Sequence, residues 1–378
     1  MAATTPAPVP IRRRILYYSI LFLVLALIME LLSRAWYYQR LSSNPSAVVQ
    51  VAKDLYHGLR SRLSTDTTVE HLRRNHYRIR PGLSPSENDR INEENFEANQ
   101  SEYVPWLEFA FRDFHGKYLN IESHVRKSVP DRSDSLAKAP YRIFFLGGST
   151  TYGYSVTDEE TIPSCFVREY RQKYPAGKPI QVINLGMPSF FSYQELIELT
   201  DKIFRDDKPD MVIMLDGLND CLQAKAAYQR APIYAPGMLD VIKPGDTRMW
   251  QKGYYELPAD MTVDSACTMI FRRYIDNISH AREITSCYAI PLYCFWQPVP
   301  YYNYPNRQND PICTQEPSER FGYVYPLVKS KAGQLPGLFF LGDMLQDEKG
   351  LPFIDHFHYS PAFNDAIAKK MLGVIRFP

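Results

Sequence analysis

Short apolar runs alternate with longer amphipathic stretches from residue 141 to the end of the chain. The apolar runs are short and rich in aromatic and β-branched residues, which predicts buried strands at 141–148, 180–186, 209–217, 290–298 and 337–342. The stretches between them have helical periodicity and predict helices at 161–174, 192–205, 267–286 and 361–375. Such alternation is typical of a parallel sheet with helices on both of its faces.

The region 34–140 lacks this regular pattern. It holds weak helical periodicity around 46–63, a charged, loop-like stretch around 80–100, and an aromatic patch at 103–120. The region could form a stalk, a cap over an active site, or extra strands of the main domain. The pattern alone leaves these three alternatives open.

Residues 15–33 form a long apolar run close to the N-terminus. As a helix, this run spans about 28 Å, close to the ~30 Å hydrocarbon core of a bilayer. Tyr17 and Tyr18 near one end and Trp36 beyond the other match the aromatic belts of bilayer interfaces. A cleaved signal peptide would have a shorter apolar region and a cleavage site of small residues, which LLSRAWYYQR does not provide. The run therefore predicts an uncleaved transmembrane anchor, with the lipid bilayer as a partner.

Basic residues on the two sides of this run predict its orientation. Residues 1–14 contain three consecutive arginines, whereas only Arg34 and Arg40 follow closely on the other side. Excess positive charge favours the cytoplasmic side, so we expect a cytoplasmic tail at 1–14. The domain at 141–378 would then lie outside the cytoplasm, in a periplasmic, extracellular or luminal space.

Composition excludes some functions. The chain has 378 residues with 43 basic and 42 acidic side chains, a net charge of +1, and no phosphate-binding loop or paired CxxC zinc motif. Nucleic acid is therefore not an expected partner, because binding its phosphates needs clustered positive charge. Six cysteines permit either disulfides in an oxidising compartment or buried free thiols, and their spacing does not decide between the two. Their positions are Cys165, Cys221, Cys267, Cys287, Cys294 and Cys313.

Polar residues follow the predicted strands where chemistry gathers in parallel sheets, at the carboxyl ends. Ser149 follows the first strand in a glycine-rich turn, Gly186 the second and Asn219 the third, while Asp355 and His358 precede the last helix. A serine hydroxyl needs an adjacent base, which an imidazole oriented by a carboxylate supplies. Backbone N–H groups of Ser149 and Gly186 and the Asn219 amide could stabilise an oxyanion. Together these groups supply what acyl transfer requires.

Other assignments compete with this one. His356 is a second candidate for the base, although its direct neighbour Asp355 is awkwardly placed to pair with it. A zinc site built from Asp355, His356 and His358 has no further ligand group in evidence, and we expect neither a metal nor a cofactor. Tyr152 and Tyr154 follow the nucleophile closely and are candidates for lining the substrate pocket.

The motifs at 147–149, 184–186, 217–220 and 355–358 resemble those of the SGNH hydrolases, the GDSL-like lipases and esterases. The usual Gly-Asp-Ser is here Gly147-Gly148-Ser149, whereas Gly-x-Asn-Asp and Asp-x-x-His are intact. The resemblance covers about residue 142 to the end. It implies a three-layer α/β/α, flavodoxin-like sandwich with Ser149, Asp355 and His358 as the triad. Ser149, Gly186 and Asn219 would form the oxyanion hole.

The expected function is hydrolysis of a carboxylic ester through a Ser149 acyl-enzyme. An acylated glycan or lipid is the expected substrate, with an O-acetyl sugar preferred because of the predicted placement. Two alternatives stay open: an O-acyltransferase that uses the same triad to modify a polysaccharide, and an idle scaffold or binding module of a membrane complex for polymer export. The sequence does not indicate an oligomeric state.

Overall fold

The computed structural model describes residues 17–25, 27–30, 80, 82–129, 139–222, 261–310, 312–313 and 319–377. The chain divides into two units, Met1–Arg73 and Arg74–Pro378. In the first unit, the described residues are helical and have exposed side chains. None of the helices in the described ranges combines the length and the apolar character needed to cross a bilayer. The predicted anchor at 15–33 lies partly outside these ranges.

A mostly parallel sheet forms the centre of the second unit, as predicted. Its strands have the order β10-β9-β8-β6-β7-β5-β4-β3, and the first five in this order are parallel to one another. These five come from the predicted apolar runs: β6 (Tyr141–Gly147), β7 (Ile180–Asn184), β8 (Met211–Asp216), β9 (Leu292–Trp296) and β10 (Leu338–Phe340). Counted along the chain, they have the flavodoxin-like order 2-1-3-4-5. The order reverses between β6 and β8, where ligands bind in such sheets.

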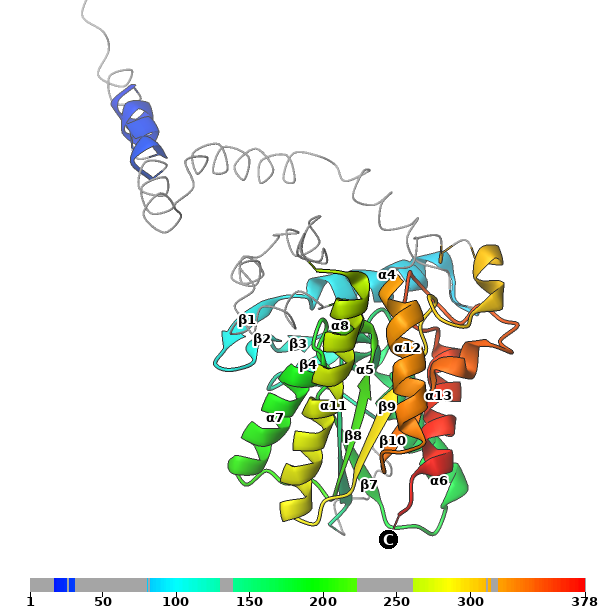
Figure 1. Ribbon diagram of the computed structural model, residues 1–378. Coiled ribbons are helices and arrows are strands. Elements are labelled where there is room, and N and C mark those ends of the chain that lie inside the picture. Colours follow the sequence, from blue (N-terminus) through cyan, green and yellow to red (C-terminus); the bar gives the residue numbers. More distant parts are fainter. Residues whose placement is uncertain are drawn as a thin grey trace, which may run out of the picture. The chain divides into compact units, whose positions relative to one another are not determined.

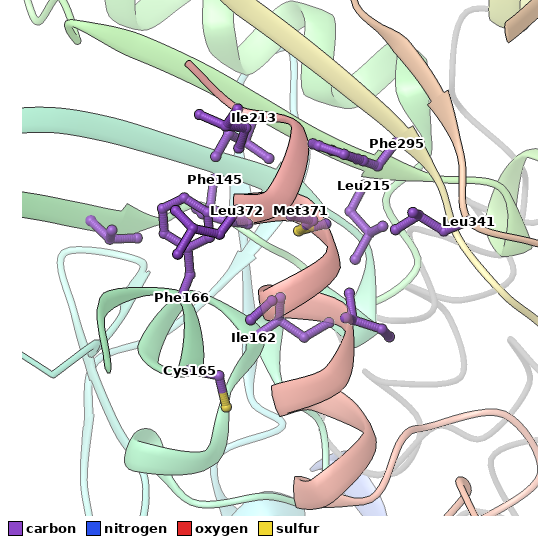
Figure 2. Packing of buried hydrophobic residues seen from close by; sticks show 14 of the residues in the cluster. Phe145, Ile162, Cys165, Phe166, Ile213, Leu215, Phe295, Leu341, Met371 and Leu372 are labelled. Atoms are coloured by element: carbon purple, nitrogen blue, oxygen red, sulfur yellow. The ribbon is translucent and has the colours of Figure 1, made fainter. Parts of the chain in front are cut away.

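Helices cover both faces of this sheet, and its central strands β6 and β8 bury side chains on both faces. In β6, Ile143 and Phe145 pack against one set of helices, and Phe144 and Leu146 pack against the other. The first set is α6 (Ile162–Lys173) and α13 (Pro361–Val374). The second set is α7 (Ser192–Phe204), α11 (Val263–Cys287) and α12 (Glu319–Ala332). Figure 1 shows this arrangement, and Figure 2 shows the α13 side of the core.

Among the described residues, two helices of more than ten residues were not predicted. Helix α4 (Pro85–Glu97) lies in the stretch interpreted as loop-like, so that interpretation was wrong. Ser84 and Glu87 form a capping box at its start, with a Ser84 N–H to Glu87 bond of 3.1 Å, and this satisfies N–H groups that the first turn cannot pair. Helix α12 contains Pro326, which obscures its periodicity. All six cysteines are free, and only Cys287 is exposed.

Part of the region before residue 140 extends the central sheet. Strands β3 (Phe114–His115), β4 (Asn120–Glu122) and β5 (Val125–Arg126) are antiparallel, and β5 pairs with β7. Strands β1 (Ser101–Val104) and β2 (Glu108–Phe111) form a separate hairpin. Arg126 anchors the extension through a buried ion pair of 2.8 Å with Asp158. Of the three alternatives for this region, added strands describe 114–126.

Candidate active site

The turn after β6 holds Ser149 at the start of a short helix, α5 (Ser149–Tyr152). Gly147 has a φ of 155°, a conformation that L side chains rarely adopt. A Cβ atom on Gly148 would collide with the side-chain amide of Asn219. A side chain at position 148 would therefore displace the Asn219 amide, and the glycine lets this amide approach the turn beside Ser149.

Ser149, His358 and Asp355 form a hydrogen-bonded row. His358 Nε2 lies 2.8 Å from Ser149 Oγ, and His358 Nδ1 lies 2.5 Å from Asp355 Oδ2. Each of these residues is only 7% exposed. His356 instead places its Nδ1 2.8 Å from the carbonyl oxygen of Ile312. The structure thus brings His358, and not His356, to the predicted nucleophile.

Asp355 is held in its charged form. Its Oδ1 accepts hydrogen bonds from the backbone N–H groups of Phe357 (3.0 Å) and His358 (2.7 Å). Burial by itself raises the pKa of Asp355, but the His358 imidazole and these N–H groups outweigh burial and leave the pKa below its ordinary value. An ionised carboxylate at this position can orient the imidazole and stabilise it when it takes a proton.

Two aromatic rings contact the His358 imidazole. The Tyr154 ring stacks on it at 4.8 Å with an interplanar angle of 28°, and the Phe357 ring meets it edge-on at 4.8 Å. Tyr152 lies elsewhere, although it was predicted to line the pocket together with Tyr154. Its side chain is 1% exposed and packs against Phe111 of the N-terminal extension. Tyr154 therefore borders the site, and Tyr152 belongs to the core.

Asn219 and Gly186 differ in what they can donate. Asn219 donates one hydrogen of its amide to the carbonyl oxygen of Phe190 at 2.7 Å, which leaves the second for another acceptor. Gly186 donates its backbone N–H to Asn184 Oδ1 at 3.0 Å, so that donor is already engaged. A Cβ atom on Gly186 would collide with the backbone N of Tyr152. Close packing against α5 therefore requires a glycine here, and the predicted oxyanion role of its N–H stays a prediction.

A residue that sequence reasoning missed lies in the loop before α7. Ser189 has a φ of 70°, in the left-handed region, and directly precedes the Phe190 carbonyl that orients Asn219. In the described part of the chain, the N–H groups of Ser189 and Ser149 have no hydrogen-bond partner. The Ser189 N–H is thus a further candidate for a backbone donor.

A small cavity of about 10 Å³ lies beside Ser149 and Asn219. It is about large enough for one water molecule. Thr150 donates to Gln297 Oε1 at 2.8 Å on its wall. Three acidic residues also line it, and the sequence analysis assigned a role to none of them: Glu195, Asp216 and Asp220, the last of which ends the Gly-x-Asn-Asp motif. Among the residues that the structure describes, no cluster of His, Cys, Asp or Glu is arranged to hold a metal ion.

The chain matches no protein-family model and no curated protein. Among solved structures it is similar to a G-D-S-L family protein from Desulfitobacterium hafniense, with 16% identity, a TM-score of 0.38, and coverage of 62% of this chain and 99% of that one. It is also similar to the acetyl xylan esterase AlAXEase, with 13% identity, a TM-score of 0.40, and coverage of 62% of this chain and 100% of that one. A third similar structure is the lipase/acylhydrolase from Enterococcus faecalis, with 18% identity, a TM-score of 0.37, and coverage of 61% of this chain and 93% of that one. Likenesses this low assign no activity to this chain, so its function must be judged from the site.

Proposed function

We propose that this protein is a serine esterase that hydrolyses a carboxylic ester through an acyl-enzyme on Ser149. The hydrogen-bonded row from Ser149 Oγ through His358 to Asp355 is the observation that carries this proposal. The buried row faces a turn whose backbone N–H is unpaired in the described part of the chain. A nucleophile, a base and an electrostatic partner therefore meet at a single point.

The distances suit stepwise proton transfer. As Ser149 Oγ attacks the ester carbonyl, His358 Nε2 accepts the hydroxyl proton across 2.8 Å. Ionised Asp355 stabilises the imidazolium that forms. His358 then donates this proton to the leaving alkoxide, and the acyl group stays on Ser149. A water molecule attacks the acyl-enzyme with His358 as the base again, which releases the acid and restores the serine.

The developing oxyanion is stabilised by donors around Ser149. The Ser149 N–H, the free hydrogen of the Asn219 amide and the Ser189 N–H take this role in our proposal. Each preorganised donor contributes roughly 2.7–4 kcal/mol to the stability of such a transition state. Gly186 is not included, because its N–H is engaged by Asn184.

Labelling with a fluorophosphonate probe tests this proposal. Wild-type protein should label, Ser149→Ala should not, and His358→Gln should label at least about a thousandfold more slowly. His356→Gln is the matched control, because it removes a neighbouring imidazole that does not reach Ser149. Undiminished labelling of Ser149→Ala would refute the assignment of the nucleophile.

The substrate class and the location are further parts of the proposal. We propose an O-acyl group on a surface or secreted glycan, acted on by a domain that the run at 15–33 tethers to the outer side of a membrane. A protease added to intact cells should then cleave the large domain, whereas full protection would exclude this orientation. Release of free acetate from an acetylated glycan, with and without an added sugar acceptor, separates hydrolysis from acyl transfer.

A further inference from the structure

Helix α7 faces the end of β8 with two polar side chains. Ser192 and Glu195 are one turn apart on its buried side, with exposures of 0% and 1%. Opposite them lie Asp216, the last residue of β8, and Asp220 in α8 (Leu218–Leu222). These two acidic residues flank Asn219 in the sequence, so contacts from α7 fix both sides of the turn that carries this amide.

One of the two contacts is an ordinary hydrogen bond. Ser192 Oγ donates to Asp220 Oδ1 at 2.5 Å, and Asn277 Nδ2 of α11 donates to Ser192 Oγ at 2.9 Å. The backbone N–H of Gly217 donates to Asp220 Oδ2 at 3.3 Å. Both oxygens of Asp220 therefore have donors, and these lower its pKa, although burial is the stronger effect and leaves the pKa raised.

The second contact joins two carboxyl groups. Glu195 and Asp216 are both buried and line the same small cavity, where their side chains act on each other's pKa. No N–H or O–H group of the described residues donates to any of their four oxygens. Two ionised carboxylates only accept hydrogen bonds and repel each other, so the contact requires a proton on one of them.

We propose that Glu195 and Asp216 share one proton, and that this clasp positions the β8–α8 turn so that the Asn219 amide faces the substrate carbonyl. Both residues line the same small cavity as Ser149 and Asn219, which connects the clasp to the site. They act through Asn219 and do not touch the reacting atoms. The inference depends on the proposed esterase function for its kinetic consequences, but the shared proton is a property of the protein alone.

The surroundings favour the protonated pair. Burial, then the neighbouring acids, raise the pKa of Glu195 and of Asp216 well above their ordinary values. The other acids that face the pair are Asp220 and, on α7, Glu198.

The groups from α11 and β9 do not neutralise the pair by charge. Tyr274 and Cys294 face it, and burial raises the pKa of each of them, so both are neutral near pH 7. The nearest cations act on other groups, since Arg273 faces Asp220 and Arg282 faces Cys294. Removal of the shared proton leaves two adjacent buried anions, which should disturb the turn at alkaline pH.

Steady-state kinetics of the full-length chain in detergent test the positioning role, with 4-nitrophenyl acetate as the probe between about pH 6 and 10. Wild-type kcat should fall at the alkaline end of this range. Glu195→Gln and Asp216→Asn each replace the shared proton by an amide N–H, so they should keep most of the kcat at pH 7 and lose the alkaline fall. Glu195→Leu leaves Asp216 buried without a donor and should lower kcat about tenfold or more, with a smaller change in KM.

An infrared measurement without substrate tests the shared proton itself. Wild-type protein should show a protonated-carboxyl band that persists at about pH 9, and Glu195→Gln should lack it. Glu198→Gln is the matched control on the same helix. The pKa of Glu198 is raised to about 7, so its own band should already have disappeared at that pH.

The outcomes separate the two proposals. Absence of the band at about pH 9 in wild-type protein overturns the shared proton, whatever the enzyme does. A band without labelling of Ser149 by the fluorophosphonate overturns the esterase function and leaves the clasp as a structural feature. A band together with the same alkaline fall in wild type and Glu195→Gln overturns the positioning role.

Discussion

Asp355 and Asp216 both belong to the surroundings of Ser149, but their pKa values are shifted in opposite directions. Both are almost fully buried, with exposures of 7% and 3%. Asp355 accepts hydrogen bonds from two backbone N–H groups and the imidazole, and its pKa is lowered. Asp216 contacts another carboxyl group, and its pKa is raised. Burial is nearly the same for the two groups, so the His358 imidazole and the backbone N–H donors of Asp355 account for the difference in pKa.

The local chain explains this difference. Asp355 begins a turn in which the N–H groups of Phe357 and His358 are not used by any helix or sheet, so they point back at its carboxylate. Asp216 ends a central strand, where the backbone pairs with the neighbouring strands instead. A turn thus creates a fixed anion that can stabilise an imidazolium. At the end of a strand, no backbone N–H donates to the Asp216 carboxyl group, so its protonated form is favoured.

Replacing Asp355 and Asp216, one at a time, by asparagine should give the largest difference in kinetic effect. Asp355→Asn removes the anion beside His358 and should lower kcat/KM by about a thousandfold or more. Asp216→Asn changes a carboxyl that already shares a proton and should cost less than about tenfold at pH 7. Kinetics with 4-nitrophenyl acetate on both variants measure this. Equal losses would mean that Asp216 also acts as an anion, and the comparison would fail.

The second-largest expected effect concerns the hydrogen-bond donors near Ser149. Asn219→Ala removes the amide that neighbours Ser149 and should lower kcat about 10²–10³-fold with little change in KM. Gly186→Ala is the control, because its N–H remains engaged while its new methyl group collides with α5. That variant should lose about 1–3 kcal/mol of folding free energy, measured by urea denaturation. A loss of kcat without destabilisation in Gly186→Ala would return the oxyanion role to this glycine.

Much of this arrangement could be predicted from the sequence, because apolar runs and strand-end motifs are local signals. The five parallel strands follow from such runs, and the pairing partners Ser149 and His358 come from segments that the fold of the sheet brings together. Alternation of strands and helices was sufficient to predict the parallel sheet.

The rest depends on contacts that sequence spacing does not show. Glu195 resembles any polar residue of an amphipathic helix until its side chain is seen against the end of β8. Gly186 was interpreted as a donor because it follows a strand, but the side chain of Asn184 captures its N–H. The strands at 114–126 are too short for a periodic signal and are held in the sheet by Arg126 and Asp158.

The Tyr154 ring, which stacks on the His358 imidazole, should stabilise the imidazolium together with Asp355. Tyr154→Leu removes the ring stacked on the imidazole and should lower kcat about three- to tenfold, because a π face stabilises the imidazolium. Tyr154→Phe keeps the ring and should stay close to wild type. Kinetics of the two variants with one ester separate the ring from the hydroxyl. If Tyr154→Phe is as slow as Tyr154→Leu, the phenol and not the ring is the important group.

Glu108 on β2 is another carboxyl group with a raised pKa, and its substitution should have the smallest effect. Its two oxygens have no donor among the described residues, and burial raises its pKa from 4.5 to about 8. A raised pKa in the folded state means that stability is complete below about pH 4.5 and is lost as the pH rises through 8. Glu108→Gln cannot ionise, so it should avoid this loss, which we expect to be about 1 kcal/mol because the residue is partly exposed. Urea denaturation of both proteins at about pH 5 and about pH 9 measures it. An identical pH dependence of stability in the two proteins would show that burial without donors does not suffice to keep a carboxyl group protonated. The raised pKa of Asp216 would then have to be caused by the neighbouring carboxyl group of Glu195.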